Sequence, residues 1–296
     1  MQNTEKKMHN TEEGKIIVID WHVFLFIAIF ASRGKGQLPS THLGLNMIIS
    51  CLRKIGVEPQ DTIYLASDFL RSWRKEYAEE YKANRKAIRE SHTDIDWKKE
   101  YSAFNQLLEN LDLGTDWIVL KGEHLEADDF ASYIVRHNKD KEIVLVTIDS
   151  DWEMLWDFGE NIKVFSPRMK PRRYKIKPKN YNVSVELEKK IQCEKADNLI
   201  SKIVTEEDYE TRKMLVNLLE LPDFIDKQID EVFENLTDKD DIDINNVPFS
   251  MLRERIETLY NDKQYLVTYD WTVGFDERKK KRLTKKKKTK TKKGKK

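Results

Sequence analysis

The stretch WIVLKGEHLEADDFASYIV, residues 117–135, joins an apolar run, a group of acids and the start of a helical pattern. The run WIVLKG (117–122) is short and β-branched, as in a buried strand, whereas FASYIV has helical apolar spacing. Between them, Glu126, Asp128 and Asp129 place three carboxylates within four residues. Their mutual repulsion requires a nearby positive charge, supplied by the dipole of the helix or by a metal ion. A strand followed by a helix in this way is typical of one unit of an α/β fold.

Three further runs of the same kind are separated by helical patterns: KIIVID (15–20), TIYLASD (62–68) and EIVLVTID (142–149). They are continuously apolar rather than alternating, as expected for parallel strands covered by helices on both faces. A fifth run, NIKVFSP, extends the predicted sheet. The segment STHLGLNMIISCLRKIG is predicted to be a connecting helix, with Ser40 or Thr41 as its N-cap and Gly56 as its C-cap. We therefore predict an α/β fold with a mainly parallel central sheet and helices on both faces.

Acidic residues follow these strands. Asp20 closes the first run and Asp68 the second, while Asp149 and Asp151 follow the fourth. Ligands of open α/β sheets bind at the carboxyl ends of the strands, so these acids and the 126–129 group are expected to converge there. Each acid alone has an ordinary alternative as a turn or N-cap residue. Together they favour an all-oxygen site for Mg²⁺ or Mn²⁺.

The composition separates an acidic body from a basic tail. The chain has 296 residues and a net charge of +1, but residues 278–296 carry 14 of the 53 Lys and Arg and no acids, which leaves 39 bases against 52 acids elsewhere. Such a tail is expected to be disordered and to add affinity for phosphate backbones, with a solubility tail or expression remnant as the alternative. Two cysteines, no apolar run of membrane length and no signal peptide predict an intracellular, cytoplasmic protein without disulfides or a zinc cluster.

The segment 71–101 mixes basic and aromatic side chains. If it is helical from Trp73 onward, one face carries a stripe within roughly 100°, at about 100° per residue, formed by Arg74, Tyr81, Lys82, Arg85 and Arg89. A basic stripe with an aromatic side chain suits a nucleic-acid backbone and a stacked base. A solvated helix with Glu–Lys pairs is the alternative.

The region after residue 180 is predicted to be helical. Glu194 and Asp197 stand three positions apart, a helical spacing at which both can face one ion. Further on, YETRKMLVNLLELPDFIDKQIDEVFENL has the pattern of two helices, which Pro222 separates.

Five motifs, in order over about residues 15–220, resemble those of the 5′-nuclease superfamily of flap endonucleases and 5′ to 3′ exonucleases, a PIN-like fold, and most closely its bacteriophage RNase H branch. IVIDWH resembles the first-strand Asp motif, and SDFLRSWRKEYAEEYKANR the Asp followed by the Arg and YKxNR signature. LEADD resembles YEADD, TIDSDWEML resembles SxDxDxxQL, and EKADN resembles GDxxDN.

This resemblance implies a role for each matching residue. Asp20, Asp68, Glu126, Asp128 and Asp129 would serve one divalent ion, some through water, and Asp149, Asp151, Glu194 and Asp197 a second one. The cations at the base of a helical arch would be catalytic: Lys82, Arg85 and Arg74. Nucleic acid would contact Arg71, Tyr81, Lys86 and Arg89, with Tyr81 stacking on a base. The reaction would be metal-dependent hydrolysis at DNA 5′ ends, 5′ flaps and RNA primers in RNA·DNA hybrids, as in replication primer removal.

The resemblance also implies an organisation: a flexible N-terminus (1–14), a nuclease domain (15–180) with the arch at 71–101, a helical DNA-binding region (181–275) and the tail (276–296). Glu194 replaces the family's usual Asp. The family follows this motif with a glycine-containing helix-turn-helix that binds duplex DNA. Here no glycine lies between Gly159 and Gly274, so the implied helix-turn-helix is atypical. The implied protein is a monomer that works beside a single-strand-binding protein or a sliding clamp. Two alternatives stay open: a non-catalytic DNA-structure-binding protein of the same fold, and a PIN-type RNase.

Overall fold

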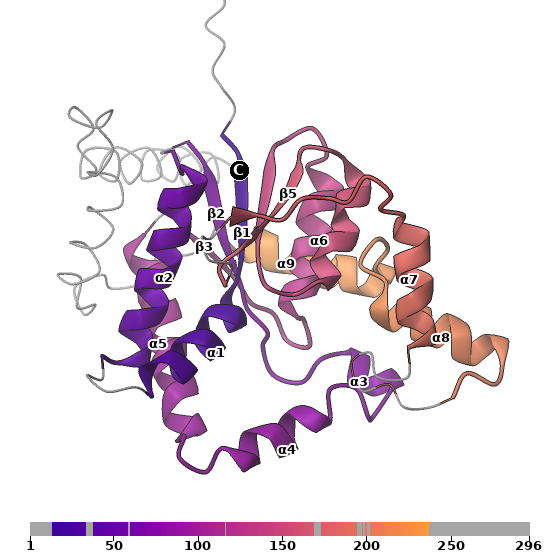
Figure 1. The fold of residues 1–296 in the computed structure, drawn as a ribbon, viewed down its shortest axis with the longest axis horizontal. Coiled ribbons are helices and arrows are strands. Elements are labelled where there is room, and N and C mark those ends of the chain that lie inside the picture. The colour runs from indigo at the N-terminus through magenta and orange to yellow at the C-terminus, as the bar shows by residue number, and fades with distance from the viewer. Residues whose placement is uncertain are drawn as a thin grey trace, which may run out of the picture.

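A computed structural model describes residues 14–33, 38–58, 60–115, 117–168, 173–193, 197, 199 and 202–236. The tail, Glu194 and the 237–275 part of the predicted C-terminal region lie outside the described residues. The chain runs through strands and helices in alternation (Figure 1): β1 (Ile16–Asp20), α1 (Trp21–Ser32), α2 (Ser40–Ile55), β2 (Thr62–Ala66), α3 (Arg74–Tyr77), α4 (Asn84–Ser91), α5 (Trp97–Gly114), β3 (Ile118–Leu120), α6 (Ala127–His137), β4 (Ile143–Val146), the 3₁₀ helix η1 (Asp151–Phe158), β5 (Ile162–Ser166), β6 (Arg173–Tyr174), α7 (Val183–Gln192), α8 (Glu206–Val216) and α9 (Asp223–Asn235).

The central sheet has the strand order β3-β2-β1-β4-β5-β6. Its first five strands are parallel, and β6 pairs antiparallel with β5 at the edge. All five predicted strands are therefore confirmed. The order reverses between β1 and β4, so the carboxyl ends of these two strands flank the crevice at which α/β sheets bind ligands.

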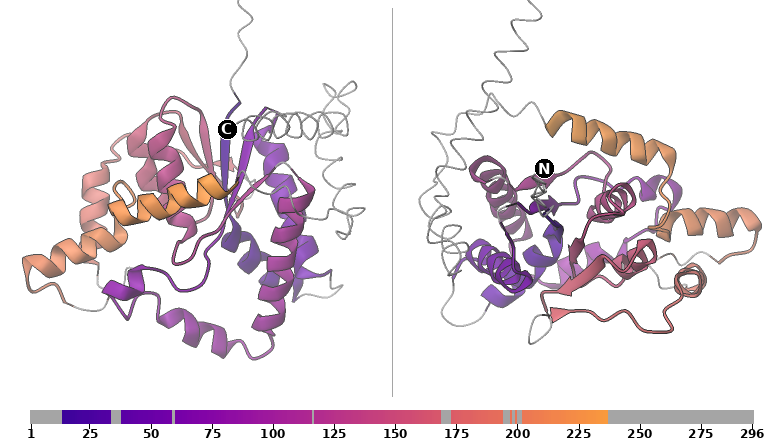
Figure 2. Two further views of the ribbon diagram at one scale, coloured as in Figure 1. Left: turned by 180° about the vertical axis from the view of Figure 1, so that it is seen from behind. Right: turned by 90° about the horizontal axis from the view of Figure 1, so that it is seen from above.

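Both faces of the sheet are covered. Ile17 and Ile19 of β1 belong to a core with α1, α2 and α5, whereas Ile16 and Val18 belong to a second core with α6, η1 and residues of α7, α8 and α9. Figures 1 and 2 show these two groups of helices on opposite sides of the strands. Burial on both faces explains why the strand sequences are continuously apolar.

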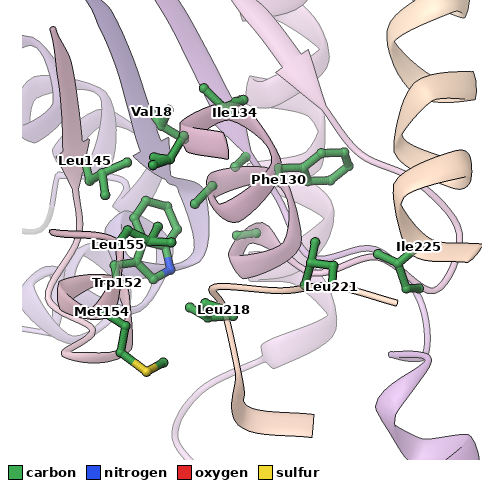
Figure 3. Packing of buried hydrophobic residues seen from close by; sticks show 14 of the residues in the cluster. Val18, Phe130, Ile134, Leu145, Trp152, Met154, Leu155, Leu218, Leu221 and Ile225 are labelled. Carbon is green, nitrogen blue, oxygen red and sulfur yellow. The ribbon is translucent and has the colours of Figure 1, made fainter. Parts of the chain in front are cut away.

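The helices after residue 180 share the core of the central sheet. Leu218, Leu221 and Ile225 pack in the same cluster as Phe130 of α6 (Figure 3). Pro222 is the N-cap of α9 and separates it from α8, as predicted. The described part of this region is thus held to the sheet by shared apolar burial, while the predicted boundary at residue 180 stays a prediction.

Two local predictions differ from the structure. Gly56 caps α2 in the left-handed conformation (φ 76°), as predicted, but Pro39 is the N-cap and Ser40 is already helical, its hydroxyl bonded to Glu100 instead. The segment after Trp73 is not one helix, because the chain leaves α3 at Ala78 in an extended conformation and restarts at α4.

The interrupted segment forms an arch. In Figures 1 and 2 the chain leaves α3 beside α8, crosses through α4 and returns to the sheet through α5. The interruption has a physical cause: the Tyr81 ring turns inward and is buried, and the backbone N–H of Lys82 donates to the carbonyl of Asp197 at 2.8 Å. Among the described residues, no helix combines the length and the apolar character needed to cross a bilayer.

Candidate active site

A cleft of about 330 Å³ lies between the carboxyl edge of the sheet and the arch. Four acids from four separate segments line it: Asp20 at the end of β1, Asp68 after β2, Asp128 in the first turn of α6 and Asp149 after β4. The predicted convergence of these acids is therefore present. The same cleft is lined by cations from the arch, namely Lys82, Arg85 and Arg89, and by aromatic side chains that include Phe26, Phe30 and Trp97.

The acids repel one another. Burial, followed by the charges of Asp128 and Asp68, raises the pKa of Asp20 well above its usual value. Burial and the charge of Asp128 likewise raise the pKa of Asp149. Carboxylates that share a site hold their protons more tightly unless a cation lies between them. The cleft therefore has the electrostatics of a cation site.

Residues of the motifs that had no predicted role contact these acids. Thr147 donates its hydroxyl to Asp20 at 2.8 Å, and the indole N–H of Trp152 donates to Asp128 at 2.7 Å. His22 accepts a hydrogen bond from the backbone N–H of Asp68 at 3.3 Å. Thr147 and Trp152 lie within TIDSDWEML, but their partners are far away in the sequence, so the motif alone gives no sign of these contacts.

The three acids of the LEADD motif divide between two roles. Asp128 faces the cleft, whereas Glu126 and Asp129 form a capping box at the start of α6, in which each side chain accepts from the other residue's backbone N–H. Asp129 is fully buried and does not line the cleft; Arg74 and the Trp73 indole contact it at 2.8 and 3.2 Å. In this arrangement the predicted direct metal role fits Asp128 and not Asp129.

Glu126 is the centre of a buried network at the base of the arch. It accepts from Arg74 at 3.0 Å, from the Tyr81 hydroxyl at 2.8 Å and from Lys82 at 2.9 Å. Burial by itself would raise the pKa of Glu126, but Lys82 and Arg74 lower it to about 2. Its carboxylate is therefore ionised and already neutralised by protein cations. It therefore belongs to the groups that hold the arch, and its predicted service to a metal ion stays a prediction.

Two predicted roles in the arch are corrected by burial. Arg74 is 1% exposed, and its guanidinium is used by Glu126, Asp129 and the Leu215 carbonyl of α8, at 2.8 Å for the last. Tyr81 is also 1% exposed, so its ring has no free face for a nucleobase. Both side chains hold the arch against α6 and α8, and neither lines the cleft.

The remaining cations have different surroundings. Burial opposes the charge of Lys82, but Glu126 and Asp128 raise its pKa above the ordinary value, so this ammonium stays protonated. Its nitrogen lies 3.9 Å from Asp128 and lines the cleft with Arg85. Arg71 and Lys86 are exposed and do not line the cleft; Arg71 donates to the Lys75 carbonyl, and Lys86 lies 3.9 Å from Glu90.

A second acidic group lies next to the cleft. The Asp151 backbone N–H donates to Asp149 at 2.9 Å, and the side chain of Lys190 in α7 pairs with Asp151 and lies 3.9 Å from Asp197. Burial raises the pKa of Asp151 to about 6 in spite of Lys190. The predicted partner Glu194 is outside the described residues.

The donor set fits divalent ions with oxygen ligands and bound water. Four carboxylates line the cleft beside His22, and the raised pKa values of two of them, Asp20 and Asp149, mark a deficit of positive charge. Within the described ranges, no three His, Cys, Asp or Glu side chains converge closely enough to enclose an ion. Mg²⁺ keeps several waters and binds through few carboxylates, so an open arrangement of this kind suits it.

Comparisons with known proteins match this geometry. A model described as the 5′-3′ exonuclease N-terminal resolvase-like domain matches residues 15–188. Ribonuclease H of Enterobacteria phage T4 is 29% identical over 175 residues, which are 58% of this chain and 56% of that protein. The match thus spans about half of this curated relative.

Two solved structures share the fold. The T5 5′-exonuclease with divalent zinc ions bound has a TM-score of 0.54 at 18% identity and covers 75% of this chain and 99% of its own. The bacteriophage T5 flap endonuclease in a pseudo-enzyme–product complex with DNA and metal ions has a TM-score of 0.55 at 17% identity, covering 75% and 98%. Because the family model matches more than half of this chain, the chain belongs to the 5′–3′ exonuclease family that has this N-terminal resolvase-like domain.

Proposed function

We propose that this protein is a divalent-metal-dependent 5′-nuclease that hydrolyses phosphodiesters at DNA 5′ ends, 5′ flaps and RNA primers in RNA·DNA hybrids. One observation carries the proposal: four carboxylates and three cations line one cleft under the arch. A phosphodiester fits this cleft, because ions held by the carboxylates and the cations of the arch can contact it together. A protein that only binds DNA would gain nothing from carboxylates beside a phosphate.

The proposed mechanism uses two Mg²⁺ or Mn²⁺ ions. When bound, they would lower the pKa of the attacking water and stabilise the leaving 3′ oxygen. Asp20, Asp68 and Asp128 would hold the first, and Asp149 with Asp151 and Asp197 the second. Thr147 and Trp152 hold two of these carboxylates in place through the hydrogen bonds described above, as the outer shell of a metal site does.

The arch would supply the positive charge that the ions do not. Lys82 stays protonated, so it acts as a cation and not as a base, and it would neutralise charge that develops on the scissile phosphate. Arg85 and Arg89 line the same cleft as Lys82 and would hold neighbouring phosphates of the strand.

The cellular setting belongs to the same proposal and is supported by the family resemblance alone. The protein would act as a monomer in the cytoplasm, during replication primer removal, beside a single-strand-binding protein or a sliding clamp.

Cleavage of a 5′-labelled flap by the purified full chain tests the proposal. We expect Mg²⁺-dependent release of the flap by the wild type, with a loss of at least about 100-fold in Asp149→Asn, since one carboxylate of the site is removed. Asp157→Asn is the matched control, because Asp157 is exposed near the far end of η1, the 3₁₀ helix that follows Asp149. DNA binding without cleavage would favour the non-catalytic alternative. Cleavage of single-stranded RNA in preference to flaps would favour a PIN-type RNase.

A further inference from the structure

One cation of the site is not explained by the proposed chemistry. Lys190, in the last turn of α7, directs its ammonium to Asp151 and Asp197, two acids that the family resemblance assigns to the second metal ion. The side chain is 19% exposed, as is that of Asp151. The lysine therefore lies beside these two acids in a largely buried position.

The position of this ammonium is set by the packing of α7. Val183, Leu187 and Ile191 are the inward residues of the helix and belong to, or pack against, the core that contains the residues of η1. Lys190 stands three positions after Leu187, so it lies at the border of this buried stripe, next to η1. Asp151 is the first residue of η1. The pairing thus joins two packed elements instead of two free surface side chains.

The electrostatics of the acids depend on this lysine. Its ammonium pairs with Asp151 and lies 3.9 Å from Asp197, so it supplies the positive charge that offsets the repulsion between these two carboxylates. A divalent ion that binds these same carboxylates would lie a few ångströms from the ammonium. Because like charges at such a distance repel, the ion and the ammonium compete for one place.

We propose that Lys190 is an internal counter-ion of the second metal position: it holds Asp151 and Asp197 together in the metal-free protein and must withdraw when the second divalent ion binds. This inference rests on the proposed function, since it assumes that the acids bind metal. Two consequences follow. The second ion binds more weakly than the first, and the occupancy of the second position is set by the divalent-ion concentration.

Binding of Mn²⁺ to the full chain, counted by electron paramagnetic resonance of the free ion without nucleic acid, tests the proposal. We compare the wild type with Lys190→Met, which keeps the length of the side chain and removes its charge. Lys189→Met is the matched control, because Lys189 is on the same turn, is 66% exposed and pairs with Glu186. We expect the wild type to bind one Mn²⁺ ion tightly and a second one weakly. In Lys190→Met alone, the weak ion should bind more tightly by about tenfold or more, because the repulsion between the ammonium and a divalent ion near 4 Å is removed.

A second measurement excludes a general effect on folding. Without metal, Lys190→Met should have a lower melting temperature than the wild type, since two acids lose their counter-ion, and saturating Mn²⁺ should raise its melting temperature more than that of the wild type. Unchanged or weaker binding of the second Mn²⁺ in Lys190→Met would overturn the inference. The failure of all three proteins to bind Mn²⁺ would instead overturn the proposed function on which it rests.

Discussion

Replacement of Arg74 by methionine tests whether this residue positions the arch or contacts the substrate. The guanidinium is 1% exposed and lies between two buried carboxylates, Glu126 at 3.0 Å and Asp129 at 2.8 Å, while its Nε donates to the Leu215 carbonyl at 2.8 Å. Removal of one partner from a buried ion pair costs about 3–5 kcal/mol, because the remaining charges stay buried without a counter-charge. We therefore expect Arg74→Met to lose about 3–5 kcal/mol of unfolding free energy.

Urea unfolding at 25 °C measures this loss. The matched control is Lys163→Met, which removes a cation from an ion pair with Glu142 in which both side chains are 44% exposed. Such a pair contributes about 0–1 kcal/mol. Arg74→Lys, which keeps the charge but not the planar fork, should fall between the two and remain folded. An unfolding free energy of Arg74→Met within about 1 kcal/mol of the wild-type value would contradict this role. A loss of cleavage at unchanged stability would show that Arg74 contacts the substrate.

Three further predictions concern two single contacts and the basic tail. Tyr81→Phe removes a buried hydrogen bond to a carboxylate and should cost about 1.5–3 kcal/mol in urea unfolding, with unchanged affinity for a single strand; weakened binding at unchanged stability would show that the hydroxyl contacts the strand instead. Trp152→Phe removes the donor to Asp128 and should weaken Mn²⁺ binding by about 10–100-fold in calorimetry, as loss of an outer-shell partner does; equal affinity would contradict that role. Deletion of 278–296 should weaken DNA binding and flatten its salt dependence in fluorescence anisotropy, and an unchanged salt slope would show that the tail does not contact the backbone.

The sheet and the acidic edge could be predicted because their signals are local. A continuous β-branched run is readable wherever it occurs, and the parallel arrangement then brings Asp20, Asp68 and Asp149 to one edge without further information. The direction of a side chain on a helix is different. Asp128 and Asp129 are neighbours in sequence and point about 100° apart, so one faces the cleft and the other Arg74. Only the packing of α6 against the arch decides which.

The break in the arch was not predictable for a related reason. The helical pattern from Arg74 onward contains no glycine or proline before α4, and the chain departs from it through contacts with distant residues. Tyr81 reaches Glu126, 45 positions away, and Lys82 reaches Asp197 through its backbone. These contacts outweigh a propensity of a few tenths of a kcal/mol per residue. Lys190 and Asp151 are also far apart in the sequence, so their pairing could not be predicted from the sequence either.

Lys82 connects the arch to both groups of acids. Its backbone has a φ of 52°, in the left-handed region that costs a non-glycine residue about 1–2 kcal/mol. That cost is offset by the backbone hydrogen bond to Asp197 and by the side-chain contact with Glu126, neither of which forms unless the chain turns at this residue. Lys82 is therefore held in two ways: its backbone N–H donates to the carbonyl of Asp197, and its ammonium, which lies 3.9 Å from Asp128, donates to the carboxylate of Glu126. A displaced arch would remove the cation from the cleft and break the backbone contact with Asp197 in the same movement, so the positions of Lys82 and Asp197 depend on each other.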